Sequence, residues 1–401
     1  MLPKPNNTNL NIALLPQGGK GWIAGVIYLQ NVIRAVGHLP ENERPELHIL
    51  LSLEGDIQEL KLPELNSNIP KLHYFAYREG ITFKQKLKAW LHSFKKKQFP
   101  YSMEGLASMV NTAALFPLQT SLGKDFPLPW IGWIPDFQHK RLPQFFSQAE
   151  INNRDHTFQK LIDEATHVVV SSQDAYKDLM RWFPTQESKV SVFSFTCVAS
   201  LQWYEDNPQK VVQHFSLPKK YLMFPSQFWR HKNHRLVFEA LRLLKEQGKD
   251  DIALVLTGNQ QDYRWPQHFN DLQEFIKHHN LSEQIYMLGL LERQQQIQLL
   301  RCAVAIIQPS LFEGWSSLVE DCRTLGKKIY LSDIPIHREQ NPPDAQFFPP
   351  ENAEVLAELI NKDWPNLQPG PDIPKEQQAY IQQQERAKDY ARLLIKIIKK
   401  L

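Results

Sequence analysis

The stretch VAIIQPSLFEGWSSLVEDCRTLGKKIYLSD, residues Val304–Asp333, decides the fold that we predict for this chain. It begins and ends with short apolar runs typical of buried strands, and a polar loop and an amphipathic segment lie between them. Two strands joined through a helix are normally parallel, because an antiparallel pair needs only a short turn. The stretch therefore predicts a β-α-β unit in a parallel sheet that is covered by helices.

The loop between this strand and this helix is a candidate binding site. Either Ser316 or Ser317 is a suitable N-cap. Free backbone N–H groups and the positive end of the helix dipole favour an anion such as phosphate at the helix start. Glu320 lies opposite the apolar face and is expected in solvent, whereas Asp321 lies at its edge and can turn toward a ligand. A capped helix with charged flanks explains the same residues equally well, so both interpretations stay open.

The same alternation of strand and helix continues through most of the chain, in two series that meet near residues 207–218. We therefore predict an α/β protein made of two doubly wound, Rossmann-like domains, residues 1–207 and 208–375. Residues 376–401 are predicted to form a terminal helix that packs back toward the first domain. The predicted strands are Asn11–Pro16, Leu47–Ser52, Lys71–Tyr77, Trp130–Pro135, His167–Ser172, Val190–Phe195, Tyr221–Ser226, Ile252–Gly258, Ile285–Leu290, Val304–Ser310 and Lys328–Asp333.

Charge and cysteine content narrow the possible functions. The 401 residues include 46 basic and 43 acidic side chains, and a net charge of +3 does not indicate a nucleic-acid binder. Cys197, Cys302 and Cys322 are too widely spaced for a disulfide framework or a zinc site, which favours a reducing, cytosolic setting. We see neither a signal peptide nor an apolar run of the roughly 18 residues that a membrane span needs.

A second group of residues, FPSQFWRHKNHRLVFEAL from Phe224 to Leu241, places two cations between a strand and a helix. Arg230 and Lys232 come just before the predicted helix start. A guanidinium and an ammonium at the carboxyl end of a strand can hold a diphosphate and neutralise it as it leaves. A solvated basic turn is the alternative.

The segment PSLFEGWSSLVEDCRTLGKKIYLSDIPIHREQ resembles the donor-sugar motif of glycosyltransferase family 4, retaining enzymes of the GT-B fold whose two domains face a central cleft. That family carries two acidic residues with seven between them, and Glu313 and Asp321 match this spacing. The resemblance implies that Glu313 binds sugar hydroxyls and that Asp321, where the family usually has glutamate, holds the nucleotide ribose. Lys232 matches the family's lysine, and Arg230 would replace an arginine where Gln227 stands. The amides expected to meet the sugar and diphosphate are those of Gly314, Trp315, Ser316 and Ser317.

Four further residues are weaker candidates for the same site. Gly25 occupies the place of a family glycine at the start of the first helix, and Gly258 lies in a loop expected to contact the donor. Asp136 and His139 follow a strand where the family has a histidine–aspartate pair, and the resemblance implies that this histidine touches the donor sugar. A surface or packing histidine is the alternative for His139.

The segment FKQKLKAWLHSFKKK, residues Phe83–Lys97, has a different character, with an apolar stripe and no acidic residue. This pattern is typical of a helix on an anionic lipid surface, where each basic residue contributes roughly 1 kcal/mol. A core-packed helix with a solvated lysine face is the alternative. The residues expected to meet the membrane surface are Lys84, Lys88, Trp90, Lys95, Lys96 and Lys97.

Taken with this family resemblance, these features imply a retaining hexosyl- or deoxyhexosyltransferase that needs no metal or other cofactor. Its expected partners are a nucleotide sugar and a glycan or lipid-linked hydroxyl acceptor, in bacterial polysaccharide, lipopolysaccharide or glycolipid assembly. We expect it in the cytoplasm, at the inner face of the membrane. The alternatives are another GT-B nucleotide-sugar enzyme, such as an epimerase, and a scaffold that keeps the fold without catalysis.

Overall fold

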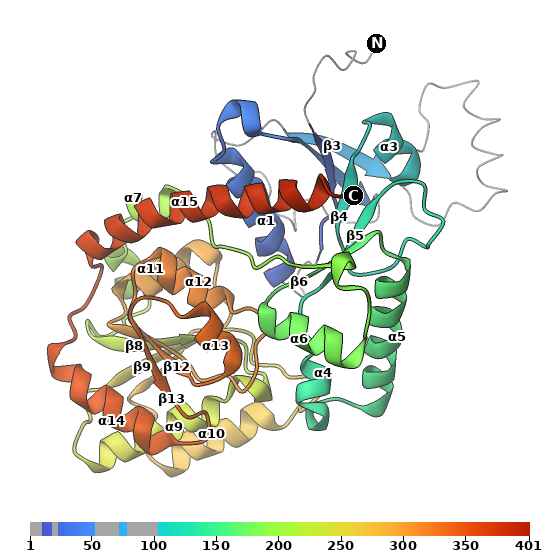
Figure 1. Ribbon diagram of the computed structural model, residues 1–401. Coiled ribbons are helices and arrows are strands. Elements are labelled where there is room, and N and C mark those ends of the chain that lie inside the picture. Colours follow the sequence, from blue (N-terminus) through green and yellow to red (C-terminus); the bar gives the residue numbers. More distant parts are fainter. Residues whose placement is uncertain (1–9, 18–22, 53–71, 78–102) are drawn as a thin grey trace, which may run out of the picture. The chain divides into compact units, whose positions relative to one another are not determined.

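The computed structural model describes residues 10–17, 23–52, 72–77 and 103–401, and Figure 1 shows their helices and strands. Contacts divide these residues into two compact units. The first unit contains the described residues up to Pro135, together with Asn153–Val198 and Gln384–Leu401. The second contains Asp136–Asn152 and Ala199–Gln383.

The first unit is built on a seven-stranded parallel sheet in the order β3-β2-β1-β4-β5-β6-β7. One of these strands, β4, is missing from the predicted set because Pro117 lies inside it and proline argues against a central strand. The ladder between β4 and β5 shifts register between Leu115 and Leu118, which accommodates this proline. The strands are β1 (Asn11–Leu14), β2 (Glu46–Ser52), β3 (Leu72–Tyr77), β4 (Ala114–Leu118), β5 (Trp130–Ile134), β6 (His167–Val170) and β7 (Val190–Val192).

The second unit is built on a six-stranded parallel sheet in the order β10-β9-β8-β11-β12-β13. All but the short edge strand β13 were predicted. Strands β8, β9, β11 and β12 are buried along their whole length, as expected for a sheet that helices cover on both faces. The strands are β8 (Tyr221–Pro225), β9 (Ala253–Thr257), β10 (Ile285–Met287), β11 (Ala305–Gln308), β12 (Ile329–Ser332) and β13 (Ala345–Phe348).

Helices connect the strands, as the alternating pattern predicts. Most are amphipathic, and in α9 the buried side chains recur at the spacing of one helical face. The described helices are α1 (Ile23–Gly37), α3 (Met103–Met109), α4 (Gln138–Arg141), α5 (Gln148–Glu164), α6 (Gln173–Trp182), α7 (Gln202–Glu205), α8 (Gln209–His214), α9 (His234–Glu246), α10 (His268–His278), α11 (Arg293–Cys302), α12 (Ser317–Thr324), α13 (Pro335–Gln340), α14 (Ala353–Asp363) and α15 (Ile373–Ile398).

The last helix, α15, completes the core of the first unit with its C-terminal half. Tyr390 stacks on Phe193 with 4.4 Å between ring centroids, and Leu394 and Ile397 are buried in the same cluster. Leu393 of the same helix is 37% exposed.

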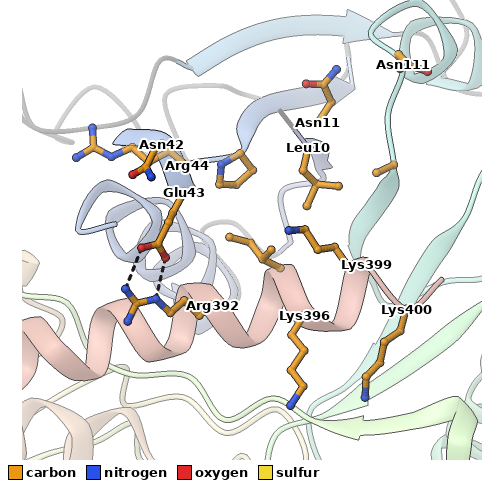
Figure 2. Close-up of a pocket in the computed structure, with 13 residues that line it drawn as sticks. Leu10, Asn11, Asn42, Glu43, Arg44, Asn111, Arg392, Lys396, Lys399 and Lys400 are labelled. Carbon is orange, nitrogen blue, oxygen red and sulfur yellow. Dashed lines mark hydrogen bonds and ion pairs between the residues drawn. The ribbon is translucent and has the colours of Figure 1, made fainter. Parts of the chain in front are cut away.

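A cavity of about 860 Å³ lies in the first unit beside the C-terminal end of α15 (Figure 2). Glu43 pairs there with Arg392, and Lys399 extends toward Leu10, which precedes β1. The cavity is therefore at the amino ends of the strands, whereas ligands of doubly wound sheets bind beyond the carboxyl ends. It is not the predicted donor site.

Two predictions made from the sequence concern membranes. The lysine-rich segment, residues 83–97, lies outside the described residues. Within the described ranges, no helix has the length and apolar character that crossing a bilayer requires.

Candidate functional site

The strand order of the second sheet points to the place where a ligand binds. The first three strands run outward in one direction and the next three in the other, so the order reverses between β8 and β11. Where the loops after two neighbouring strands lead in opposite directions, they leave a crevice at the carboxyl ends of those strands. Strand β8 ends at Pro225 and β11 at Gln308, and the loops that follow carry Lys232 and Glu313.

Lys232 and Glu313 form an ion pair across this reversal point. The Nζ atom of Lys232 lies 2.6 Å from Oε1 of Glu313, and the two side chains are only 19% and 10% exposed. The side-chain amide of Gln308 donates a second hydrogen bond of 2.7 Å to the same oxygen. Two residues that the sequence analysis placed in the site are thus brought into direct contact, although 81 positions separate them.

The surroundings of this pair keep the carboxyl group of Glu313 ionised. Burial by itself raises its pKa, but the charge and hydrogen bond of Lys232 outweigh burial and leave the pKa below its usual value. Two histidines nearby stay neutral near pH 7. Burial, followed by the charge of Lys232, lowers the pKa of His231 to about 3. Burial is also the main cause that lowers the pKa of His337 to about 4. The charged pair is therefore flanked by two neutral imidazoles.

The start of α12 lies beside the pair. Ser316, one of the two predicted candidates, is the N-cap, and its hydroxyl accepts a hydrogen bond from the backbone N–H of Val319. Gln340 was not foreseen, and it accepts from the N–H of Ser316 at 3.0 Å. One amide of the predicted anion seat is therefore already bonded. Glu320 was expected in solvent and this prediction is wrong: it is 1% exposed and accepts from Gln340, because α13 covers that side of α12.

Asp321, the second acidic residue of the motif, is 3% exposed and faces a cation that the sequence analysis did not predict. Both of its carboxylate oxygens accept from Arg293, at 2.5 and 2.8 Å. Arg293 is the first residue of α11, which follows β10 along the same edge of the sheet.

Arg230, the other predicted diphosphate ligand, lies in an aromatic environment. Its guanidinium carbon is 4.2 Å from the ring centroid of Trp265 and 5.6 Å from that of Phe145. Its backbone N–H donates to Asp262 at 3.1 Å. Two cations do not bond to each other, so the joint contact of Arg230 and Lys232 with a diphosphate stays a prediction.

Asp136 and His139 belong to the segment that packs with the second unit. The carboxylate of Asp136 accepts from the N–H of Gln138 at 2.9 Å, which fixes the turn that starts α4. The ring of His139 is fully buried and meets the ring of Phe146 edge-on, with 6.3 Å between centroids. In this structure His139 is a packed residue, and its contact with a sugar stays a prediction.

The predicted glycines differ in what their positions require. Gly258 has a φ of +126°, and a Cβ added there would lie 2.4 Å from the carbonyl oxygen of Ser226, so only glycine fits. Its N–H donates to the carbonyl of Gly289 at 2.7 Å. Gly25 is buried in the first turn of α1. Gly314 and Trp315 are half-buried in the loop that leads to α12.

Metal ligands are a separate question. Within the part of the chain that the structure describes, no three His, Cys, Asp or Glu side chains are grouped to hold an ion. The three cysteines are buried and form no disulfide.

Sequence reasoning missed two glutamines and one arginine of the site. Gln308 and Gln340 bind the motif residues from outside the motif, and glutamine in a strand end or short helix carries no spacing signal. Arg293 stands at the start of a helix that was predicted, 28 positions before its partner. A cation at a helix start interacts unfavourably with the helix dipole. This unusual position was the signal in the sequence that Arg293 has a partner elsewhere.

Comparison with known proteins agrees with this geometry. Residues 206–364 match the family model described as "Glycosyl transferases group 1". The matched segment lies within the second unit. It contains both members of the ion pair and the whole of α12, so the group 1 match covers the site just described. Comparison with curated protein sequences found no match.

Solved structures extend the likeness to the first unit as well. HepE of Anabaena, solved in complex with UDP, is 15% identical with a TM-score of 0.64, and the match covers 98% of this chain and 100% of that one. Sucrose-phosphate synthase from Thermosynechococcus elongatus is 12% identical with a TM-score of 0.63, over 98% and 99% of the two chains. A glycosyltransferase from Rickettsia africae is 15% identical with a TM-score of 0.61, over 98% and 97%. At these identities the likeness shows the fold, and the predicted GT-B fold is confirmed.

Proposed function

We propose that this chain is a retaining glycosyltransferase that moves a sugar from a nucleotide-diphosphate donor to a hydroxyl acceptor. The ion pair between Lys232 and Glu313 is the observation that supports this proposal most strongly. A nucleotide sugar has a phosphate directly beside a ring that carries hydroxyls. A cation and a carboxylate that are 2.6 Å apart offer one partner to each of these neighbouring groups.

The pair also has the protonation state that this role needs. Near pH 7 Glu313 is a carboxylate, which accepts hydrogen bonds from sugar hydroxyls, and Lys232 is an ammonium, which attracts the diphosphate. Donor binding would loosen their mutual contact and give each a ligand group instead. Because both side chains are mostly buried, they form few competing contacts with water, and the new contacts would be correspondingly strong.

The reaction that we propose depends on positioning and charge stabilisation. The bond between the anomeric carbon and the donor phosphate breaks, and a bond from the same carbon to the acceptor oxygen forms on the same face. The acceptor's proton goes to an oxygen of the leaving phosphate. Lys232 and the N-terminal end of α12 take up the charge that grows on the diphosphate. Glu313 binds the sugar and is not assigned as the base.

The donor and the acceptor follow as further parts of the proposal. Solved structures of HepE contain UDP and glucose, or UDP-glucose, which makes UDP sugars the first donors to test. WaaG, a glycosyltransferase involved in lipopolysaccharide biosynthesis, is 13% identical with a TM-score of 0.54. It supports a glycan or lipid-linked acceptor. Docking on an anionic membrane through residues 83–97 belongs to the same proposal.

The test is a screen of nucleotide sugars for release of the nucleoside diphosphate, with water as the slow acceptor. We expect one donor to be hydrolysed, and we expect Glu313→Gln and Lys232→Ala to slow this at least a hundredfold. Lys328→Ala is the matched control, because Lys328 also pairs with a carboxylate, Asp363 at 2.9 Å, but directly precedes β12, at the end of the strand opposite the loops of the site.

Three outcomes separate the alternatives. If the site variants keep the wild-type rate, the assignment of the pair is wrong. A chain that binds a nucleoside diphosphate but turns over no donor is a scaffold. Retention is read from the anomeric coupling constant of the transfer product by NMR, and an inverted product contradicts that part of the proposal.

A further inference from the structure

The second acidic residue of the motif is already held by a guanidinium. Asp321 receives two parallel hydrogen bonds from the Nη atoms of Arg293, at 2.5 and 2.8 Å. Such a two-point pair between arginine and a carboxylate fixes both groups in one geometry. The exposures are unequal, because the side chain of Asp321 is 4% exposed and that of Arg293 is 25% exposed. A ligand that enters here reaches the guanidinium before the carboxylate.

The pair lies within reach of a ligand at the start of α12. Asp321 is four positions after Ser317, the first residue of that helix, which corresponds to about 6 Å along the axis. Arg293 starts α11 at the carboxyl end of the neighbouring part of the sheet, and its guanidinium lies 5.1 Å from the ring centroid of Trp203. If the diphosphate binds at the start of α12, the attached nucleoside would lie near this pair, at the carboxyl edge of the sheet.

The chemistry of the two groups differs in what it can recognise. A carboxylate only accepts hydrogen bonds and therefore suits the donating hydroxyls of a ribose. A guanidinium only donates, so it suits oxygen acceptors such as ribose oxygens or base carbonyls. Asp321 has a shorter arm than glutamate, and its oxygens are both bound to Arg293. Arg293 is the more exposed member of the pair, at 25% against 4%, so the larger accessible surface belongs to the cation.

We infer that Arg293 is the specificity-determining residue for the nucleoside part of the donor, and that Asp321 acts as a positioning residue that holds its guanidinium. This inference rests on the proposed function, because it assumes a nucleoside diphosphate at the start of α12. It assigns Asp321 a different role from the direct ribose contact that the family resemblance implies.

The test compares two ligands by isothermal titration calorimetry. One is whichever of UDP, GDP, ADP and dTDP binds the wild type most tightly, and the other is pyrophosphate, which has no nucleoside. Losing a hydrogen bond from a charged donor is expected to weaken binding by tenfold or more. We therefore expect Arg293→Gln to raise the dissociation constant of the nucleoside diphosphate at least tenfold. The dissociation constant of pyrophosphate should change by less than twofold.

Further variants separate positioning from direct contact and from misfolding. Asp321→Asn should also weaken binding of the nucleoside diphosphate. In a chain that already carries Arg293→Gln, it should cause no further loss of affinity. That double variant also removes both charges, so no buried carboxylate is left without a partner. Arg338→Gln is the matched control, because Arg338 makes a similar two-point pair with Asp333 at 2.6 and 2.7 Å but is 54% exposed; it should leave both affinities unchanged.

Two results overturn the inference. If Arg293→Gln leaves the nucleoside diphosphate affinity unchanged while Asp321→Asn weakens it in either background, Asp321 holds the ribose directly. If Arg293→Gln weakens pyrophosphate as much as the nucleoside diphosphate, Arg293 does not recognise the nucleoside. Failure of all four nucleoside diphosphates to bind the wild type contradicts the inference together with the proposed function, and the two rival results above contradict the inference alone.

Discussion

Removing Lys232 leaves the carboxylate of Glu313 buried without its cation, and the effect on stability can be worked from the structure. At 2.6 Å and an effective dielectric constant of about 20, the attraction is about 6 kcal/mol before desolvation is subtracted. Breaking a buried pair on one side costs roughly 3–5 kcal/mol. The side chains keep 19% and 10% exposure, and Gln308 still donates to Glu313, so we expect the lower end, about 3 kcal/mol, for Lys232→Met.

The assay is urea unfolding of the full chain, compared between Lys232→Met, Glu313→Gln and the double variant. The double variant carries no unpaired carboxylate and should be more stable than Lys232→Met alone. Equal destabilisation of the single lysine variant and the double variant would refute the reasoning, because the loss would then come from packing and not from an unpaired charge.

The pH dependence of stability in the same variants independently tests the direction in which the pKa of Glu313 shifts. In the wild type the folded pKa of Glu313 lies below the unfolded value, so the pair stabilises the fold above the unfolded pKa, and this contribution is lost as pH falls through the folded pKa. In Lys232→Met burial dominates and the folded pKa rises above the unfolded value. Glu313 then takes up a proton at moderately acidic pH, and the stability deficit relative to wild type should shrink between pH 7 and pH 5. A constant deficit contradicts this account.

Three further substitutions test other parts of the second unit by thermal and urea unfolding. Gly258→Ala should destabilise the chain far more than Gly248→Ala, because both have positive φ but only the first would place its Cβ against backbone, at 2.4 Å; equal losses contradict this. Arg301→Met should cost about 3–5 kcal/mol, because its partner Glu376 is 3% exposed, and Arg301→Met/Glu376→Leu should recover part of that loss. Ser316→Ala should cost about 1 kcal/mol through the lost N-cap, whereas Ser316→Thr, which can still cap, should stay close to wild type.

Much of the architecture could be predicted because local patterns and the fold agree. Buried runs such as Ala253–Thr257 alternate with amphipathic helices, and that alternation is sufficient for two parallel sheets. Strand β4 was not predicted because Pro117 lies within it, and proline argues against a central strand. The register shift between β4 and β5 accommodates the proline. Glu320 was misplaced because a helical wheel shows one helix by itself, whereas α13 supplies Gln340 as a partner on the supposedly solvated side.

The site was predictable where its residues lie in one motif or at a strand end. Glu313 and Lys232 were both identified, since each follows a strand at the reversal point of the sheet. Their contact could not be derived from spacing, because it depends on β8 and β11 being neighbours. The same holds for Arg293, which meets Asp321 only because α11 and α12 start at the same edge.

The most direct test is a crystal structure of the chain soaked with the nucleoside diphosphate that binds it most tightly. We predict diphosphate oxygens within hydrogen-bonding distance of the Nζ atom of Lys232 and of the backbone N–H groups of Gly314, Trp315 or Ser317. Clear density for the ligand elsewhere, with Lys232 still bound to Glu313 and the start of α12 without ligand contacts, would contradict the account.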